Sequence, residues 1–357
     1  MSDAPEQKSF SLLRILLIAV PAAAIAWGVK SYWDGQQQAA EANTQQNTVR
    51  NLLGTESANA LAKDFQDADE DLLADPPEDA EKLQDPEELV FSYYASLAEA
   101  GDEATEEQNW KAFTDALSKA TNKPVKYVHF NDVNEQLRAL KDGSLHITAF
   151  GTGAVPTAVN KSGFTPLCCF ADAEGNYSYT MKIIVPADSK IEKVEQLRGK
   201  RVTFTRPRSN SGYKAALALL LDEHDMQPER DYKWGFSYGH ENSIKGIADG
   251  KFEAAAVASD ILDRMIAGGE IEEGSVRVIH ESKPFPPGVL GYVYNLKPEL
   301  RDAIREAVAD FQVEGTPLIE AYGAGEPLAL AMVNYKEDWG PVRAINEAVE
   351  AARDEVK

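Results

Sequence analysis

The chain of 357 residues has few of the side chains that bind metals or act as nucleophiles. Its two cysteines, Cys168 and Cys169, are adjacent in the apolar run 165–170, and no Cys-x-x-Cys is present. Neighbouring strand residues point to opposite faces, so we expect two separate, buried thiols. The five histidines are scattered without metal-ligand spacing: His129, His146, His224, His240 and His280. The sequence therefore predicts neither a metal centre nor a cofactor.

Recognisable catalytic motifs are also missing. The chain has no serine nucleophile elbow, no His-Glu-x-x-His and no phosphate-binding P-loop. The apolar neighbours of Cys168 and Cys169 argue against a reactive thiol. We therefore expect a protein that is not an enzyme, with a hydrolase as the remote alternative.

Positive charge is in short supply. The 36 Lys and Arg residues face 58 Asp and Glu residues, for a net charge of −22. This balance argues against nucleic-acid binding and against docking on an anionic membrane surface. About fifteen of the acids, against three bases, lie between Asp34 and Glu88. With few aromatic or β-branched residues, 34–87 is predicted to be a largely disordered acidic spacer.

Only one long apolar run occurs, from Ile15 to Val29, interrupted by Pro21 and preceded by Lys8 and Arg14. Its length fits either a signal anchor or a signal peptide cleaved near the small residues 22–26. Positive charge before the run and acid after it predict export of everything beyond residue 33. Residues 1–33 are thus expected to contact the membrane, and the remainder to be periplasmic or otherwise extracytoplasmic.

From Glu88 onward, strand-like and helix-like segments alternate, which predicts an α/β fold with mostly parallel sheets. We expect two lobes: 88–184 begins the first, 185–284 forms the second, and 285–357 completes the first and adds C-terminal helices. The run 179–186 is interpreted as one crossover, and the strand 291–295 follows the return. Two lobes joined by two crossovers predict a hinged cleft that binds a ligand at the strand ends.

The most informative segment is 200–225. A strand-like run, 200–205, enters the polar turn Ser209-Asn210-Ser211-Gly212, which opens an apolar-periodic helix. A helix start has N–H groups without intrahelical acceptors and partial positive charge, and therefore attracts anions. The serine hydroxyls add donors, and Gly212 permits close approach. The alternative is that Ser209 or Ser211 only caps the helix.

Two later strands end at further polar residues. His240 follows the strand-like stretch 232–238, and Asp260 follows the stretch 254–258. Alone, His240 can be a solvated loop residue and Asp260 a helix cap. Three strand ends in one lobe would instead bring Ser211, His240 and Asp260 to one edge. A carboxylate beside an anion is tolerated if the ligand carries a proton or an ammonium group, so Asp260 favours a protonated phosphorus oxyanion over sulfate.

These residues resemble a known family. The chain is similar to phosphonate/phosphite-type periplasmic substrate-binding proteins of ABC transporters. The similarity lies in Gly-Lys-Arg-Val-Thr-Phe-Thr before Ser-Asn-Ser-Gly-Tyr, then in Gly-His-Glu-Asn-Ser-Ile and in Asp-Gly-Lys-Phe-Glu-Ala-Ala-Ala. The resemblance covers about 89–300. It implies a type II periplasmic-binding fold with two lobes and two hinge crossovers, which closes over a phosphorus oxyanion and works with a permease.

The resemblance also implies site residues. Ser209, Asn210 and Ser211 match the family's oxyanion turn, in which Asn210 replaces a threonine. His240 and Tyr179 match residues that contact the oxyanion, and Tyr94 falls where an aromatic side chain is common. The full predicted set is Ser209, Asn210, Ser211, Gly212, His240, Asp260, Tyr179 and Tyr94.

One departure concerns the ligand. Asp260 lies where binders of aminoalkylphosphonates keep an acid for the ammonium group, but Pro287-Gly288 stands where some have a second acid. This difference favours a smaller ligand. The sequence thus predicts an exported, membrane-tethered binding protein for phosphonate, phosphite or phosphate; an anchored anion-sensing receptor domain is the alternative.

Overall fold

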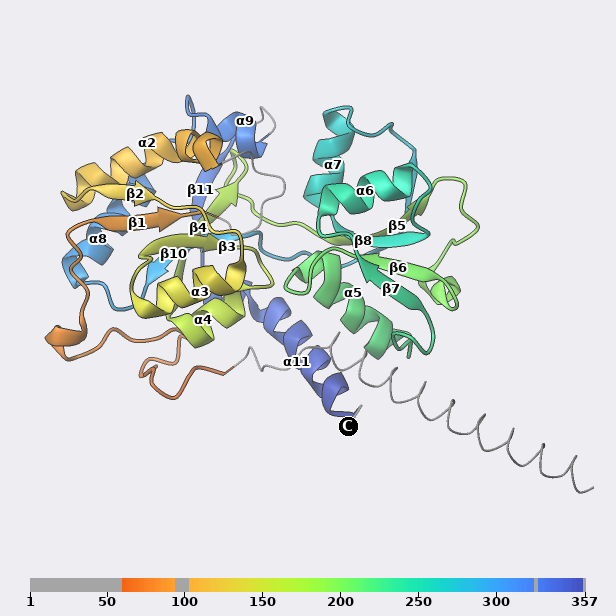
Figure 1. Cartoon of the computed structure of the whole chain (residues 1–357), viewed down its shortest axis with the longest axis horizontal. Helices are drawn as coiled ribbons and strands as arrows, with labels where there is room; N and C mark the ends of the chain where they lie inside the picture. The colour runs from red at the N-terminus through yellow and green to blue at the C-terminus, as the bar shows by residue number, and fades with distance from the viewer. Residues whose placement is uncertain (1–59, 94–102, 324–326, 356–357) are drawn as a thin grey trace, which may run out of the picture.

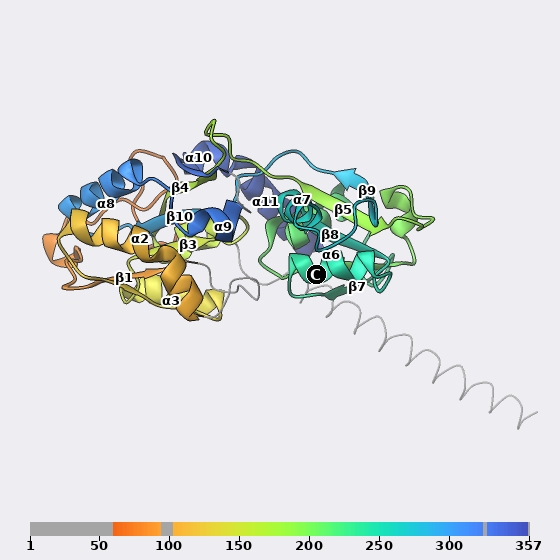
Figure 2. The ribbon, with the colours of Figure 1, turned by 90° about the horizontal axis from the view of Figure 1, so that it is seen from above.

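The computed structural model describes residues 60–93, 103–323 and 327–355. Two lobes lie side by side in both views (Figures 1 and 2), each built on its own sheet with helices packed around it. The strand order is β11-β4-β10-β3-β1-β2 in the first lobe and β7-β6-β8-β5-β9 in the second. The predicted two-lobed α/β fold is therefore confirmed. The expectation of mostly parallel sheets is wrong, since both sheets mix parallel and antiparallel pairs.

The first lobe takes strands from both ends of the described chain. Its strands are β1 (Leu89–Ser92), β2 (Val125–Tyr127), β3 (Ile147–Phe150), β4 (Phe164–Ala171), β10 (Val289–Val293) and β11 (Ala329–Met332). Its helices are α2 (Glu103–Thr121), α3 (Val133–Asp142), α4 (Val155–Ser162), α8 (Pro298–Asp310), α9 (Leu318–Gly323) and α10 (Tyr335–Asp338). The chain returns to this lobe at β10.

The second lobe is continuous in sequence. Its strands are β5 (Met181–Pro186), β6 (Arg201–Phe204), β7 (Lys233–Phe236), β8 (Ala254–Ala258) and β9 (Val276–Glu281). Its helical segments are a 3₁₀ turn (Val194–Leu197), a π-helical turn (Asn210–Lys214), α5 (Ala215–Ala218), a second π turn (Leu219–Glu223), α6 (His240–Ala248) and α7 (Ser259–Ala267).

Local sequence signals explain several of these bounds. The Asp132 side chain accepts hydrogen bonds from the N–H groups of Asn134 and Glu135 and so caps α3. Gly143 ends the same helix with φ of 82°, a left-handed conformation that glycine adopts at little cost. Cys168 and Cys169 are buried and unbridged in β4, as expected.

The two connections between lobes lie at 172–180 and 282–288, and the run 179–186 is not itself a crossover. β5 starts at Met181 and pairs with β8 and β9, so the second lobe begins earlier than the expected boundary at 185. The connections touch at one point, where Tyr179 and Phe285 exchange two backbone hydrogen bonds of 3.0 and 2.7 Å. This short antiparallel bridge ties the hinge segments together.

The C-terminal helix α11 (Gly340–Glu355) links the lobes a third time. It follows Trp339, whose indole N–H donates to the carbonyl oxygen of Thr152 in the first lobe at 3.2 Å. From there it packs against α5 and the π turn of the second lobe, as Figure 1 shows below the lobe junction. The C-terminal helices were expected with the first lobe, so the packing of α11 against the second lobe was not predicted.

The prediction of a disordered spacer does not hold for 60–87, which we call the N-terminal strap. Its backbone bonds to Asn160 and Asn295, and the ring of Phe65 meets that of Tyr294 at 4.9 Å. The acidic residues of the strap help to hold it in place, since Asp85 pairs with two lysines of the first lobe, Lys123 and Lys297. These contacts order a segment that lacks a core of its own.

The expected signal segment, 1–33, and the first part of the expected spacer, 34–59, lie outside the described residues. Within the described ranges, no helix combines the length and apolar character needed to cross a bilayer.

Candidate functional site

Three parallel strands of the second lobe aim the predicted site residues at one edge. β6 pairs in parallel with both β7 and β8, so their carboxyl ends lie side by side. The turn at Ser209 follows β6, His240 follows β7 and Asp260 follows β8. The sheet topology thus produces the common edge that the three strand ends predict.

The turn after β6 is both a helix cap and a set of hydrogen-bond donors. Ser209 is the N-cap, and its hydroxyl oxygen accepts from the N–H of Gly212 at 3.0 Å. The structural alternative considered for Ser209 is therefore correct in itself, and it is compatible with an anion site because other first-turn N–H groups have no intrahelical acceptor. The opening turn is π-helical, a wide form frequent at functional sites.

Glycine is required at position 212 by close packing. A Cβ added there would lie 1.8 Å from the hydroxyl oxygen of Thr205 at the end of β6. The N–H of Thr205 also donates to the carbonyl oxygen of Gly212 at 2.8 Å. Asn210 and Ser211 are only 2% and 1% exposed, so the turn is held tightly between the strand end and the neighbouring lobe.

His240 is a neutral donor with a defined tautomer. Its Nδ1 accepts a hydrogen bond from the N–H of Ala258 at 3.0 Å, so the proton of the neutral ring lies on Nε2. That Nε2 is 3.4 Å from the hydroxyl oxygen of Ser209. Burial lowers the pKa of His240 to about 4, with nearby Arg206 acting in the same direction. The ring is thus uncharged at neutral pH and directs an N–H toward the turn.

Tyr179 brings the hinge into the same cluster. Its hydroxyl lies 3.4 Å from the side-chain nitrogen of Asn210, which donates to it. Burial raises the pKa of Tyr179, while hydrogen bonding from Thr152, Asn210 and Ser211 acts the other way. The phenol stays protonated and retains an O–H that can donate.

Asp260 lies in the first turn of α7 beside Tyr179. Part of its side chain is open to solvent. Desolvation by the surrounding protein nevertheless raises the pKa of the carboxyl, while backbone hydrogen bonds from Ile261 and from Asp260 itself act to lower it. Its charge in turn contributes to the raised pKa of Tyr179. The preceding residue, Ser259, fixes the start of α7 to the hinge through paired 2.9 Å hydrogen bonds with Thr180.

The first lobe covers the turn with the loop 151–153, which sequence reasoning missed. A Cβ at Gly153 would lie 2.4 Å from the carbonyl oxygen of Arg208 and 2.7 Å from the backbone nitrogen of Asn210. Lys214 donates to the carbonyl oxygen of Gly153 at 2.7 Å, and Arg208 donates to Asn134 of α3 at 2.7 Å. The two lobes therefore touch directly at the predicted turn.

The available signal for this loop was Gly-Thr-Gly directly after a buried strand, the position where polar loops of α/β folds meet ligands. Of the predicted residues, the structure brings Ser209, Asn210, Ser211, Gly212, His240, Tyr179 and Asp260 into one region between the lobes. Tyr94 lies outside the described residues.

One acidic cluster lies elsewhere. Among the described residues, the side chains close enough to share a metal ion are those of Asp67, Asp69 and Asp71 in the N-terminal strap. None of the residues at the lobe junction belongs to this set.

Comparison with known proteins points to one family. A model of the family described as ABC transporter, phosphonate, periplasmic substrate-binding protein, matches residues 97–330. The phosphate-import protein PhnD of Mycolicibacterium smegmatis is 27% identical over 203 residues, which are 54% of this chain and 63% of that protein. The match therefore spans less than two thirds of that relative.

Solved structures share the fold. A binding protein component of an ABC phosphonate transporter from Pseudomonas aeruginosa is 17% identical, with a TM-score of 0.61 over 75% of this chain and 89% of that one. PhnD1 from Prochlorococcus marinus, solved in complex with methylphosphonate, is 12% identical, with a TM-score of 0.61 over 74% of this chain and 99% of that one.

Proposed function

Since the chain belongs to the family of phosphonate periplasmic substrate-binding proteins of ABC transporters, we propose that it captures a phosphorus oxyanion (a phosphonate, phosphite or phosphate) between its lobes and delivers it to an ABC permease. The family is one of transporter binding proteins, in agreement with the expectation that the chain is not an enzyme. One relative is named for phosphate import and one structural neighbour holds methylphosphonate, both small phosphorus oxyanions.

The observation that carries this proposal is the convergence of neutral donors on one helix start. The Nε2–H of His240, the hydroxyls of Ser209 and Tyr179, and the first-turn N–H groups after Ser209 lie together at the lobe junction. Preorganised neutral donors with a helix dipole suit a compact oxyanion. Asp260 favours a ligand that still carries a proton, since its carboxylate can accept from a P–OH and would repel a fully ionised sulfate.

Burial of the turn implies how the ligand is taken up. Asn210 and Ser211 are nearly inaccessible while Gly153 stands over them. The anion would enter with the lobes apart and be enclosed when the loop 151–153 returns. A bound anion that contacts both lobes lowers the free energy of the closed arrangement, which the permease would recognise.

Calorimetric titration with methylphosphonate, phosphite, phosphate, 2-aminoethylphosphonate and sulfate tests the proposal. We expect one-to-one binding of at least one phosphorus oxyanion and none of sulfate. The matched pair Ser209→Asp and Ser209→Asn isolates charge, because both side chains cap helices well. Ser209→Asn should bind within about tenfold of wild type, and Ser209→Asp should not bind, because its carboxylate opposes the anion.

Two outcomes would contradict the proposal. Equal binding by the two Ser209 variants would remove the turn from the site. Steady release of a product from any of these phosphorus compounds would replace the transport function with an enzymatic one.

We further propose that the apolar run 15–29 holds the protein at the membrane, with everything beyond residue 33 outside the cytoplasm. The support is the sequence pattern of basic residues before the run and acidic residues after it. Cell fractionation of the full chain and of a form lacking residues 1–33 tests this. The full chain should sediment with membranes after an alkaline wash; recovery in the soluble fraction would show that it is not anchored.

A further inference from the structure

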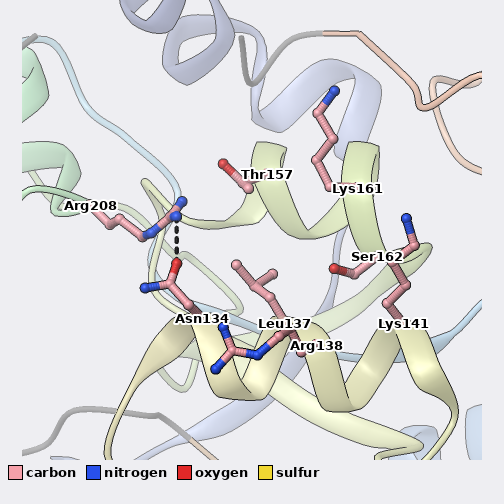
Figure 3. A pocket seen from close by; sticks show the side chains of 8 residues that line it. All are labelled: Asn134, Leu137, Arg138, Lys141, Thr157, Lys161, Ser162 and Arg208. Atoms are coloured by element: carbon pink, nitrogen blue, oxygen red, sulfur yellow. Dashed lines mark hydrogen bonds between the residues drawn. The ribbon is translucent and has the colours of Figure 1, made fainter. Parts of the chain in front are cut away.

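A second cluster of positive charge lies outside the site described above. A cavity of about 510 Å³ opens between α3 and α4 beside the lobe junction (Figure 3). Four cationic side chains line it: Arg138 and Lys141 from α3, Lys161 from α4, and Arg208 from the loop before Ser209. No carboxylate is part of the lining.

The absence of compensating acid separates this cavity from ordinary surface charge. Isolated unpaired lysines and arginines are common on proteins. Here four gather around one cavity, and none forms an ion pair within the described residues. The chain has 58 acidic and 36 basic residues, so a carboxylate partner is easy to find. Other cations frequently pair with one, as Lys123 and Lys297 do. Of the acids near these cations on α3, Asp132 caps the helix, Asp142 accepts from Ser144, and Glu135 forms no ion pair with any of the four in the described part of the chain.

The remaining lining fits a small ligand rich in oxygen. The hydroxyl residues Thr157 and Ser162 are 7% and 3% exposed, and Asn134 supplies an amide. Leu137 is the one apolar side chain in the lining. A protein partner would be anchored by aromatic and aliphatic side chains in apolar pockets, which this lining does not offer. Guanidinium and ammonium groups match phosphate oxygens, and the volume lies in the range of small-molecule sites, roughly 300–1,000 Å³.

The cavity also crosses the boundary between the lobes. Arg138, Lys141 and Lys161 belong to the first lobe, whereas Arg208 belongs to the second and reaches Asn134 with a 2.7 Å hydrogen bond. Arg208 directly precedes the N-cap Ser209. An anion that engaged all four cations would hold the two lobes together beside the predicted turn.

We propose that this cavity is a second anion site, for an anion with two or more linked phosphates, and that the bound anion bridges the lobes. A single phosphate would leave some of the four charges unmatched, whereas a phosphate chain can contact several at once. Inorganic polyphosphate and the phosphate chain of a nucleoside triphosphate share this chemistry. The site is separate from the proposed phosphorus-oxyanion cleft and does not depend on it.

The test is titration of tripolyphosphate into the protein at low ionic strength, with and without saturating methylphosphonate. We expect one equivalent to bind in both conditions. Lys141→Gln/Lys161→Gln should weaken binding at least tenfold, and Arg208→Gln should weaken it at least threefold if the second lobe contributes. The charge-matched control is Lys119→Gln/Lys126→Gln, two exposed lysines of the first lobe outside the cavity, which should bind within twofold of wild type. Circular dichroism would confirm that all variants are folded.

Further arms identify the source of the phosphates. ATP binding tighter than that of tripolyphosphate, with no binding of AMP, would favour a nucleotide; binding of tripolyphosphate alone would favour the inorganic anion. Either result supports the site. Equal losses in the two double variants, loss of binding in methylphosphonate, or displacement of tripolyphosphate by hexaglutamate at equal concentration would overturn it, the last in favour of an acidic polypeptide.

Discussion

The Nδ1 of His240 accepts a hydrogen bond from the backbone N–H of Ala258 at 3.0 Å, which fixes the ring between the ends of β7 and β8. The bond leaves the proton of the neutral ring on Nε2, toward Ser209. Because a protonated ring could not accept from Ala258, the native structure binds the neutral form, consistent with a pKa near 4.

This arrangement predicts how stability depends on pH. The pKa of His240 is about 4 in the folded chain and about 6.5 when unfolded, so the unfolded state binds more protons between those values. The free energy of unfolding should fall as pH drops from 7 to 4. Replacing His240 with Gln should reduce that fall by about 1–2 kcal/mol. Urea unfolding at pH 7 and pH 4.5 measures it.

His146 offers an internal comparison. Its Nδ1 accepts from the N–H of Val90 at 2.9 Å, and burial lowers its pKa to about 4 as well. His146→Gln should reduce the same pH dependence without changing affinity for methylphosphonate, whereas His240→Phe should weaken that affinity. An unchanged affinity in His240→Phe would exclude the ring from the site.

The contact between the lobes at Gly153 predicts a steric effect on closure. Gly153→Ala places a Cβ 2.4 Å from the Arg208 carbonyl oxygen, and overpacking of this kind costs about 1–3 kcal/mol. The closed arrangement should be disfavoured, and affinity for methylphosphonate should fall about tenfold or more. Gly151→Ala is the matched control, since a Cβ there meets nothing within 4 Å.

Small-angle scattering and calorimetry would check the Gly153 prediction. Gly153→Ala should have a larger radius of gyration than wild type, and Gly151→Ala should not. Wild-type dimensions and affinity in Gly153→Ala would mean that the loop yields without moving the lobes.

Asp260 is predicted to set ligand selectivity. Asp260→Asn replaces a charged acceptor for a P–OH with the weaker, neutral oxygen of an amide, so affinity for a singly protonated phosphorus oxyanion should fall about 10- to 100-fold. Sulfate, no longer repelled, should begin to bind. Asp249→Asn, on an exposed aspartate paired with Lys251, is the control. Competition titrations that find sulfate still excluded by Asp260→Asn would show that another group discriminates.

Lys214 should respond to alkaline pH. Burial lowers its pKa to about 7, against about 10.4 in an unfolded chain, so the unfolded state binds more protons between pH 7 and 10. Lys214 should therefore increase the free energy of unfolding as the pH rises from 7 to 10. Lys214→Met should remove about 1–3 kcal/mol of this gain. Lys251→Met, at an exposed lysine, should leave it intact when unfolding is followed at pH 7 and 9.5.

Local patterns predicted what short stretches of chain determine by themselves. The strand, polar turn and helix at 200–225 could be predicted because the spacing of apolar residues changes from the strand pattern to the helix pattern within a few positions, with turn residues in between. The shared edge of Ser209, His240 and Asp260 followed from the parallel order of the strands. The Asp132 N-cap and Gly143 at the ends of α3 are local features of the same kind.

Contacts between distant segments were not predictable in the same way. Nothing near Gly153 or Lys214 in the sequence reveals that they meet, because they lie 61 positions apart and come together only where the lobes touch. The strap 60–87 was interpreted as disordered from its composition, yet its partners, such as Tyr294 and Lys297, lie more than 200 residues away. The four cations of the α3–α4 cavity come from three separate segments for the same reason.

The strap has a mechanical consequence. Among the described residues, its hydrogen bonds and ion pairs with the body, from Asn160 to Lys336, fall on the first lobe. Tension applied at residue 60 would therefore be borne by that lobe alone, leaving the hinge unloaded and the other half free to swing. A protein held in this way could open and close its lobes at the same rate whether or not its N-terminus is attached to a membrane.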